Sequence, residues 1–167
     1  LFSIGGEKRL LTLKKHNGDM KVYKIKENGS LGAVVQMDNL SSGWNIAKMF
    51  KIAAPHSLIN AFPYLFLYNK ELGAIRVHRV NLDGTVSMVI QDKELSGTWT
   101  DATFYNVKSK DFLLLTNSET KAGHIYEVNK DGTIGERIHT RQFGLGWTGS
   151  RYFRNQGKSY LLKMKED

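Results

Sequence analysis

The residues best suited to binding a ligand recur at fixed positions along this chain. Trp44, Trp99 and Trp147 each lie 15 positions after a glycine, as Trp44 follows Gly29. An indole ring stacks on the C–H face of a sugar, while amide, imidazole and hydroxyl groups bond to the sugar hydroxyls. Groups of this kind recur in two further segments: Tyr23, His78 and Tyr126 in one, and Gln36, Gln91 and His139 in the other. These nine residues predict a repeated site that binds a glycan or a small saccharide.

The recurring tryptophans also have a purely structural interpretation. A large aromatic residue at one position of a repeat often fills the space between neighbouring units, with its N–H bonded to the backbone. The same interpretation applies to the Tyr/His position. Both the packing role and the ligand-binding role stay open from the sequence.

The sequence carries no pattern typical of catalysis or metal binding. Its five histidines are scattered and never fall at metal-ligand spacing, and it has no cysteine, which excludes disulfides and thiolate chemistry. A Gly-x-Ser-x-Gly elbow, a phosphate-binding loop and a dinucleotide fingerprint are all missing. We therefore expect a non-catalytic binding module with no cofactor and no metal.

Composition allows an anionic partner without requiring one. The chain has 167 residues, 41% of them hydrophobic, and a net charge of +8. Its basic residues are dispersed, which is typical of a solvated surface and does not favour nucleic acid as a partner. Three of them share one repeat position, so binding of a polyanion is an alternative function: Lys21, Arg76 and His124. No apolar run approaches 18 residues, so no membrane span is expected.

Four kinds of short segment carry these residues. Each is rich in Val, Ile, Leu, Phe and Tyr and is bounded by Gly, Asn or Asp, which predicts β-strands. The first kind comprises 1–4, 49–52, 103–106 and 152–155; the second, 9–14, 64–69, 112–117 and 160–165; the third, 20–26, 75–81 and 124–129; the fourth, 33–37, 88–92 and 136–140. The chain is therefore predicted to be all-β, with about 14 short strands.

Hairpin turns join the third and fourth segments of each unit. They are Asn28-Gly29, Asp83-Gly84 and Asp131-Gly132, and both dipeptide types tolerate positive φ. The second segments are almost continuously apolar, as in 64–68 and 112–115. Continuous apolar strands indicate burial on both faces, which favours a β-propeller of stacked four-stranded antiparallel sheets over the alternative, a β-trefoil.

The repeat divides the single domain 1–167 into units of about 1–48, 49–102 and 103–151, followed by a partial unit, 152–167. The middle unit holds extra residues around 53–61, which predicts a surface loop. About three and a half blades do not close a ring of the usual four to eight. We therefore expect the chain to be a fragment, or to close by pairing with another chain or with missing sequence.

The residues 146–148, Gly-Trp-Thr, together with 152–153 and 160–162, resemble bacterial tandem GWT-type repeats and the blades of seven-bladed propeller lectins of the fucose-binding type. The resemblance implies sugar sites between neighbouring blades, each combining a tryptophan with polar side chains. The chain departs from the Gly-Trp-Thr pattern at Asn45 and Thr98, so such sites would not be equivalent. Alternatives to the lectin function are a protein-interaction scaffold and a toxin-associated targeting domain.

Overall fold

The structure is a computed structural model that describes residues 1–52, 62–143, 147–155 and 158–165, and within these ranges every regular element is a β-strand. No described segment is a helix able to cross a membrane. The strands are β1 (Phe2–Ile4), β2 (Glu7–Leu13), β3 (Asp19–Ile25), β4 (Leu31–Asn39), β5 (Ile46–Lys51), β6 (Pro63–Asn69), β7 (Ala74–Val80), β8 (Val86–Glu94), β9 (Asp101–Val107), β10 (Lys110–Thr116), β11 (Ala122–Val128), β12 (Ile134–Gln142), β13 (Trp147–Asn155) and β14 (Lys158–Lys165).

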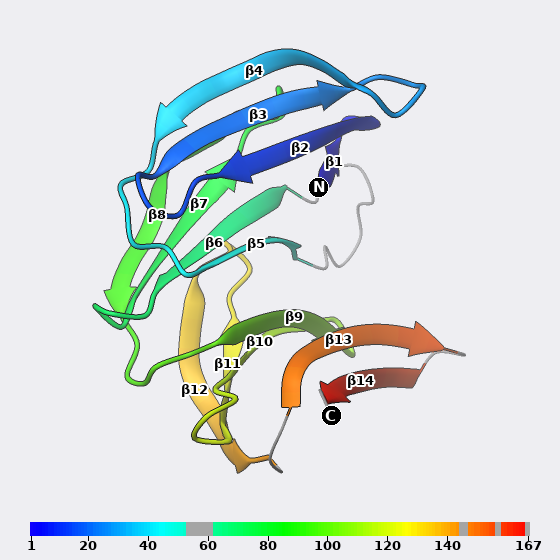
Figure 1. The fold of residues 1–167 in the computed structure, drawn as a ribbon. Coiled ribbons are helices and arrows are strands. Elements are labelled where there is room, and N and C mark those ends of the chain that lie inside the picture. Colours follow the sequence, from blue (N-terminus) through cyan, green and yellow to red (C-terminus); the bar gives the residue numbers. More distant parts are fainter. Residues whose placement is uncertain (53–61, 144–146, 156–157, 166–167) are drawn as a thin grey trace.

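The strands form four antiparallel sheets in chain order: β1–β4, β5–β8, β9–β12 and the two-stranded β13–β14. We call them the first to fourth sheets. The sheets stack face to face along an arc (Figure 1). The first strands of the sheets line the concave side of this arc, and β4, β8 and β12 lie on its outer side. The predicted propeller-like fold of tandem four-stranded sheets is confirmed.

Strand register fixes which residues are equivalent in successive sheets. Phe50 pairs with Tyr64, Tyr105 with Phe112 and Phe153 with Tyr160. Each pair is stacked, with ring centroids 5.2, 5.4 and 5.2 Å apart. Tyr105, not Phe104, is therefore the counterpart of Phe50, and the first-strand alignment 49–52 with 103–106 is wrong by one residue, because it followed the phenylalanines rather than the pairing.

The unit boundaries also differ slightly from the strands. All three predicted boundaries fall inside strands: 48/49 in β5, 102/103 in β9 and 151/152 in β13. The extra residues of the middle unit lie between β5 and β6, as expected. The predicted loop itself, 53–61, lies outside the described residues.

Strand β6 shows why the second segments are continuously apolar. All of its residues are buried, and alternate side chains enter different cores. Leu65 and Leu67 belong to the core between the first and second sheets, whereas Tyr64, Phe66 and Tyr68 belong to the core between the second and third. Burial on both faces requires apolar residues at every position.

The predicted hairpin turns have the expected backbone. Gly29, Gly84 and Gly132 have φ of +82°, +86° and +88°. Asp83 and Asp131 each accept a hydrogen bond at 2.9 Å from the backbone N–H of the residue two positions later. Bonds from the Thr85 and Thr133 hydroxyls and backbone hold the pKa of these two carboxyls below its usual value. The aspartates therefore form turns, as their sequence context predicts.

Candidate functional site

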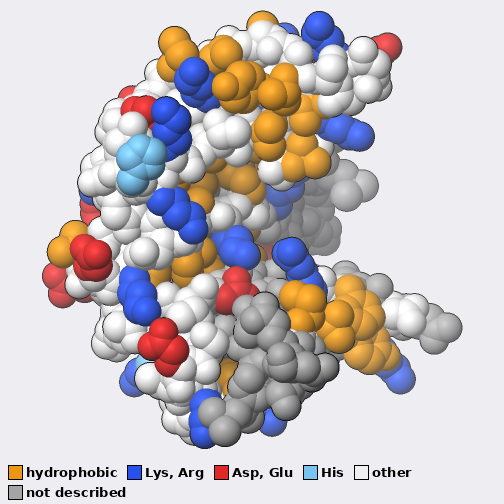
Figure 2. All heavy atoms as spheres, viewed as in Figure 1, with side chains coloured by type: hydrophobic (Ala, Val, Ile, Leu, Met, Phe, Trp, Pro, Cys, Tyr) orange, Lys and Arg blue, Asp and Glu red, His pale blue; other side chains and the backbone are white. Residues whose placement is uncertain are grey.

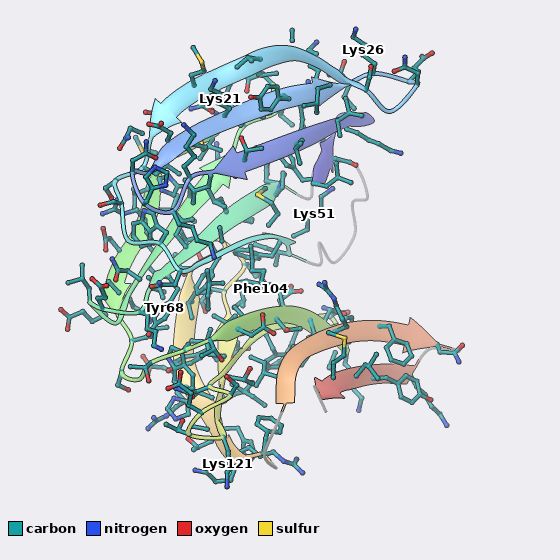
Figure 3. All side chains as sticks on the ribbon, viewed as in Figure 1. Lys21, Lys26, Lys51, Tyr68, Phe104 and Lys121 are labelled. Atoms are coloured by element: carbon teal, nitrogen blue, oxygen red, sulfur yellow. The ribbon has the colours of Figure 1, made fainter. Side chains whose placement is uncertain are left out.

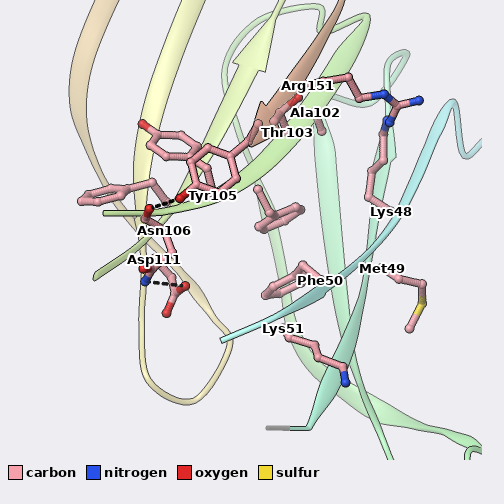
Figure 4. A pocket seen from close by; sticks show the side chains of 13 residues that line it. Lys48, Met49, Phe50, Lys51, Ala102, Thr103, Tyr105, Asn106, Asp111 and Arg151 are labelled. Carbon is pink, nitrogen blue, oxygen red and sulfur yellow. Dashed lines mark hydrogen bonds between the residues drawn. The ribbon is translucent and has the colours of Figure 1, made fainter. Parts of the chain in front are cut away.

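A cavity of about 380 Å³ lies among the first strands of three successive sheets, β5, β9 and β13 (Figure 4). Its size falls within the range of small-molecule sites. It is lined by residues of β5, β9, β10 and β13: Lys48, Met49, Phe50, Lys51, Ala102, Thr103, Phe104, Tyr105, Asn106, Asp111, Phe112, Arg151 and Tyr152. None of the nine residues selected from the sequence belongs to this wall.

Three cationic side chains give the cavity its charge. Lys48, Lys51 and Arg151 line it, and Figure 4 shows Lys48 and Arg151 directed toward one end and Lys51 toward the other. The Lys48 ammonium lies 3.2 Å from a carboxylate oxygen of Asp101. Lys51 and Arg151 are exposed and have no carboxylate within salt-bridge distance among the described residues. Together these charges favour an anionic ligand.

Asp111 is the one acidic residue of the cavity wall. It is buried, and one of its carboxylate oxygens accepts a hydrogen bond from the Asn106 side-chain amide at 3.3 Å. The same amide nitrogen donates to the Lys110 carbonyl at 3.0 Å, and the Tyr152 hydroxyl donates to the Asn106 carbonyl at 2.5 Å. These bonds fix the position of the carboxylate between the third and fourth sheets.

Aromatic rings form the apolar part of the wall. Phe50 and Phe104 are stacked, with centroids 3.9 Å apart and planes at 2°. Tyr105 lies 5.8 Å from Tyr152 across the third and fourth sheets, and burial raises the pKa of the Tyr105 hydroxyl. The cavity thus combines flat apolar surfaces with hydroxyl, amide and charged groups. Nowhere in the described ranges do three His, Asp or Glu residues gather as metal ligands would.

The structure places Trp44 and Trp99 between sheets. Trp44 belongs to the core between the first and second sheets, and its indole N–H donates to the Leu40 carbonyl at 2.7 Å. Trp99 belongs to the next core, and its indole nitrogen is buried with no partner among the described atoms. Both rings are at most 4% exposed. This is the packing interpretation of the recurring tryptophans. The side chain of Trp147 lies outside the described residues.

A basic side chain of the following sheet covers each of these two indoles. The Arg76 guanidinium lies 5.1 Å from the Trp44 ring centroid, and the His124 ring lies 4.5 Å from that of Trp99. Arg76 also bonds to Asp92, with nitrogen–oxygen distances of 2.9 and 2.7 Å. Arg76 and His124 therefore pack on indoles within the fold, whereas Lys21, the third residue at this position, is exposed.

The Tyr/His position also faces the space between sheets. His78 and Tyr126 are buried, and Tyr23 of the first sheet is half-buried. His78 Nδ1 bonds to the Ser87 carbonyl at 3.0 Å, and burial lowers the pKa of its imidazole. The buried Nε2 has no partner among the described atoms.

Gln36 and Gln91 join neighbouring sheets. The Gln36 amide accepts from the Val86 N–H at 2.6 Å and donates to the Val86 carbonyl at 3.1 Å. Gln91 repeats this with Ile134, at 2.7 and 2.9 Å. His139, the third member of the series, is exposed on β12. Apart from Tyr23, His139 and the undescribed side chain of Trp147, the selected residues thus lie in successive inter-sheet spaces, and the assignment of all nine to ligand binding stays a prediction.

No family model matches the chain, and no curated protein matches it, so the resemblance to GWT-type repeats stays a prediction. Several solved structures resemble it, including the following two. One is a periplasmic gluconolactonase of Pseudomonas aeruginosa, at 16% identity and a TM-score of 0.53, over 78% of this chain and 35% of that one. The other is described as a putative 6-phosphogluconolactonase of Bacteroides fragilis, at 13% identity and a TM-score of 0.43, over 98% of this chain and 68% of that one.

This chain therefore spans about a third of the length of the gluconolactonase, and the likeness at 16% identity establishes the fold. The comparison nevertheless corrects the expected function. We expected a non-catalytic, lectin-like module, whereas the structure that shares the fold at a TM-score of 0.53 is described as a gluconolactonase, so the non-catalytic expectation is not upheld. The physical reason for the error is that the lectin resemblance rests on glycines and aromatic residues that build the sheets, and such residues serve any function placed on this fold.

Proposed function

We propose that the central cavity binds a small, polyhydroxylated, anionic molecule and that the propeller containing it hydrolyses a sugar lactone. The observation that carries this proposal is one cavity that combines Lys48, Lys51 and Arg151 with the buried carboxylate of Asp111. The lactone is suggested by the gluconolactonase that shares the fold. That the substrate is a sugar lactone is therefore part of this proposal.

The cavity residues suit both parts of such a ligand. The lactone itself is neutral, and its hydrolysis releases a sugar acid whose carboxylate the cations of the cavity attract. Asn106, Thr103 and Tyr105 supply amide and hydroxyl groups near the stacked rings, which match the alternating polar and C–H surfaces of a sugar.

Hydrolysis needs a base and a positive environment for the oxyanion. Asp111 accepts a proton from a water molecule as the water oxygen attacks the lactone carbonyl carbon. Lys51, which holds the repeat position of Asn106 opposite Asp111, stabilises the negative charge that develops on the carbonyl oxygen. When the carbonyl re-forms, the ring C–O bond breaks, and the ring oxygen takes the proton from Asp111. One lactone and one water give one hydroxy acid.

The proposal is tested with glucono-δ-lactone by following acid release above the uncatalysed rate, together with calorimetric titration of gluconate. Asp111→Asn should lower kcat by about 10²–10⁴-fold and leave gluconate binding in place, because it removes the base and keeps the shape of the side chain. Lys51→Met should weaken gluconate binding about tenfold, the effect of losing one charge-assisted bond.

The matched control is Lys26→Met, an exposed lysine of the β3–β4 turn, which lies far from the cavity in Figure 3 and should change neither quantity. If Lys51→Met and Lys26→Met change gluconate binding equally, the cavity is not the gluconate site. If the chain neither accelerates the hydrolysis nor binds gluconate, the proposed function is wrong.

A further inference from the structure

The two ends of the arc expose faces that are buried everywhere else in the fold. Figure 2 shows hydrophobic side chains gathered over the first sheet and over the fourth sheet, at opposite ends of the arc. The same repeat positions in the interior sheets form the cores between sheets. A large exposed apolar surface of this kind marks an interaction site.

The fourth sheet exposes the residues with which interior sheets pack on the sheet that follows. Its stacked pair Phe153–Tyr160 is 45% and 42% exposed, whereas the equivalent pair of the second sheet, Phe50–Tyr64, is 5% exposed at both rings. Leu162 is 51% exposed, and its counterpart in the second sheet is fully buried. This face lacks a following sheet among the described residues.

The first sheet exposes the complementary positions. Leu31 is 52% exposed, whereas its counterparts Val86 and Ile134 are 7% and 1% exposed against the preceding sheet. Leu10 and Ile25 hold the positions of Leu65 and Val80, which are buried in the core between the first two sheets. No preceding sheet covers this face among the described residues.

The turn glycines supply an independent marker of the same contact. A Cβ on Gly132 would lie 2.3 Å from the Tyr64 ring of the preceding sheet, and one on Gly84 would lie 2.9 Å from the Arg9 side chain. A Cβ on Gly29 would meet nothing within 4 Å. The equivalent of Arg9 and Tyr64 on the fourth sheet is Tyr160.

We infer that two copies of this chain pair head to tail, with the fourth sheet of each copy packed on the first sheet of the other. Tyr160 of one copy then contacts Gly29 of the second copy, which repeats the contact of Tyr64 with Gly132. A second copy is the partner because each chain carries both halves of an interface that the arc already uses between its own sheets. The two contacts are equivalent and close a two-fold ring.

Such a ring holds eight sheets, four from each copy, which lies within the range of closed propellers. Closure also completes the cavity, because β1 of the second copy comes next to β13 on the concave side. The inference concerns the ends of the arc and does not depend on what the cavity binds.

Sedimentation equilibrium tests the pairing. The chain should give a species of twice its mass of 18.9 kDa. Leu31→Lys and Leu162→Lys should each give a folded monomer, because each places a charge in one half of the interface at a site exposed within the single chain. Met88→Lys is the matched control: Met88 is 78% exposed on the outer strand β8, and the change should leave the mass doubled.

Mixing the two monomeric variants distinguishes the geometry. A mixed pair places both lysines in one interface and keeps the other intact, so about half of the interface survives and pairing should return in part. A face-to-face dimer would respond to only one of the two substitutions. A chain that sediments as a monomer, or a dimer that tolerates both lysines, overturns the inference, whatever the lactone assay gives.

Discussion

Alanine at the three equivalent turn glycines tests how the sheets pack, because the backbone strain is the same at each and the neighbours differ. Gly29, Gly84 and Gly132 have φ within a few degrees of one another. A Cβ would meet open space at Gly29, the Arg9 side chain at Gly84 and the Tyr64 ring at Gly132. The differences among the three variants therefore report the inter-sheet contact alone.

Strain sets the common part of the effect. An alanine held at positive φ costs about 1–2 kcal/mol, offset by about 0.4–1 kcal/mol from the stiffer unfolded chain. Gly29→Ala should therefore lower the free energy of unfolding by about 1 kcal/mol. At Gly132 the Tyr64 ring must also move, although it is buried and stacked on Phe50. Overpacking of this kind adds about 1–3 kcal/mol.

Gly84→Ala should give an intermediate value. The nearest atom is Arg9 Nε, 2.9 Å from the new Cβ, and it has no hydrogen-bond partner among the described atoms. The Arg9 side chain can therefore shift by rotation about its own bonds without breaking a bond to Nε. The predicted order of destabilisation is Gly132→Ala, then Gly84→Ala, then Gly29→Ala.

Urea unfolding followed by tryptophan fluorescence gives the three values, since Trp44 and Trp99 are buried between sheets. All three substitutions are made in a Leu162→Lys background, so that pairing of copies does not contribute. If Gly132→Ala and Gly29→Ala differ by less than about 0.5 kcal/mol, the third sheet does not pack on Tyr64 as the structure shows.

Two further predictions concern the spaces between sheets. Gln91→Ala should lower the free energy of unfolding by about 1–3 kcal/mol, because it leaves the Ile134 N–H and C=O without their hydrogen bonds to the Gln91 amide. The control, Gln142→Ala at an exposed position, should lower it by less than about 0.5 kcal/mol. Equal losses for the two variants in urea titrations would contradict the bridging role of Gln91. The buried His78 imidazole has a lowered pKa, so just below pH 6.5 only the unfolded chain takes up the proton. The free energy of unfolding should therefore be at its full value above the unfolded pKa of about 6.5 and should fall as the pH drops below it. His78→Tyr, which installs the residue type of Tyr23 and Tyr126, should flatten the profile of urea midpoints between about pH 7 and pH 5, and an unchanged slope would count against this reasoning.

Periodic features of the sequence predicted the fold because they encode contacts that every sheet repeats. The Asn-Gly and Asp-Gly turns require positive φ, and the continuous apolar run 64–68 requires two covered faces, so both follow from local chemistry. The second role of Gly84 and Gly132, close approach to the preceding sheet, depends on how the sheets stack. A turn signal alone does not contain that information.

The same logic explains why Gln36 and Gln91 attracted attention as ligand groups. An amide that recurs at one position has a repeated partner, and a repeated ligand is one way to supply it. The structure supplies another, the backbone of Val86 and Ile134 at the start of the next outer strand. Only the stacking of the sheets distinguishes these partners, because the sequence gives the spacing of the amides and not their surroundings.

The sequence did not indicate the cavity residues as ligand-binding candidates, because these residues share a repeat position without sharing a residue type. Lys48, Thr103 and Arg151 pair with Phe66, Leu114 and Leu162, which makes them equivalent on the first strands of three sheets. A search for residue types that recur at one repeat position overlooks such a set. It finds residues with the same role in each sheet, and that role is packing between sheets. A single central site draws a different side chain from each sheet, so the positions to examine in a repeat of this kind are the first strands, where the register agrees and the residue types differ.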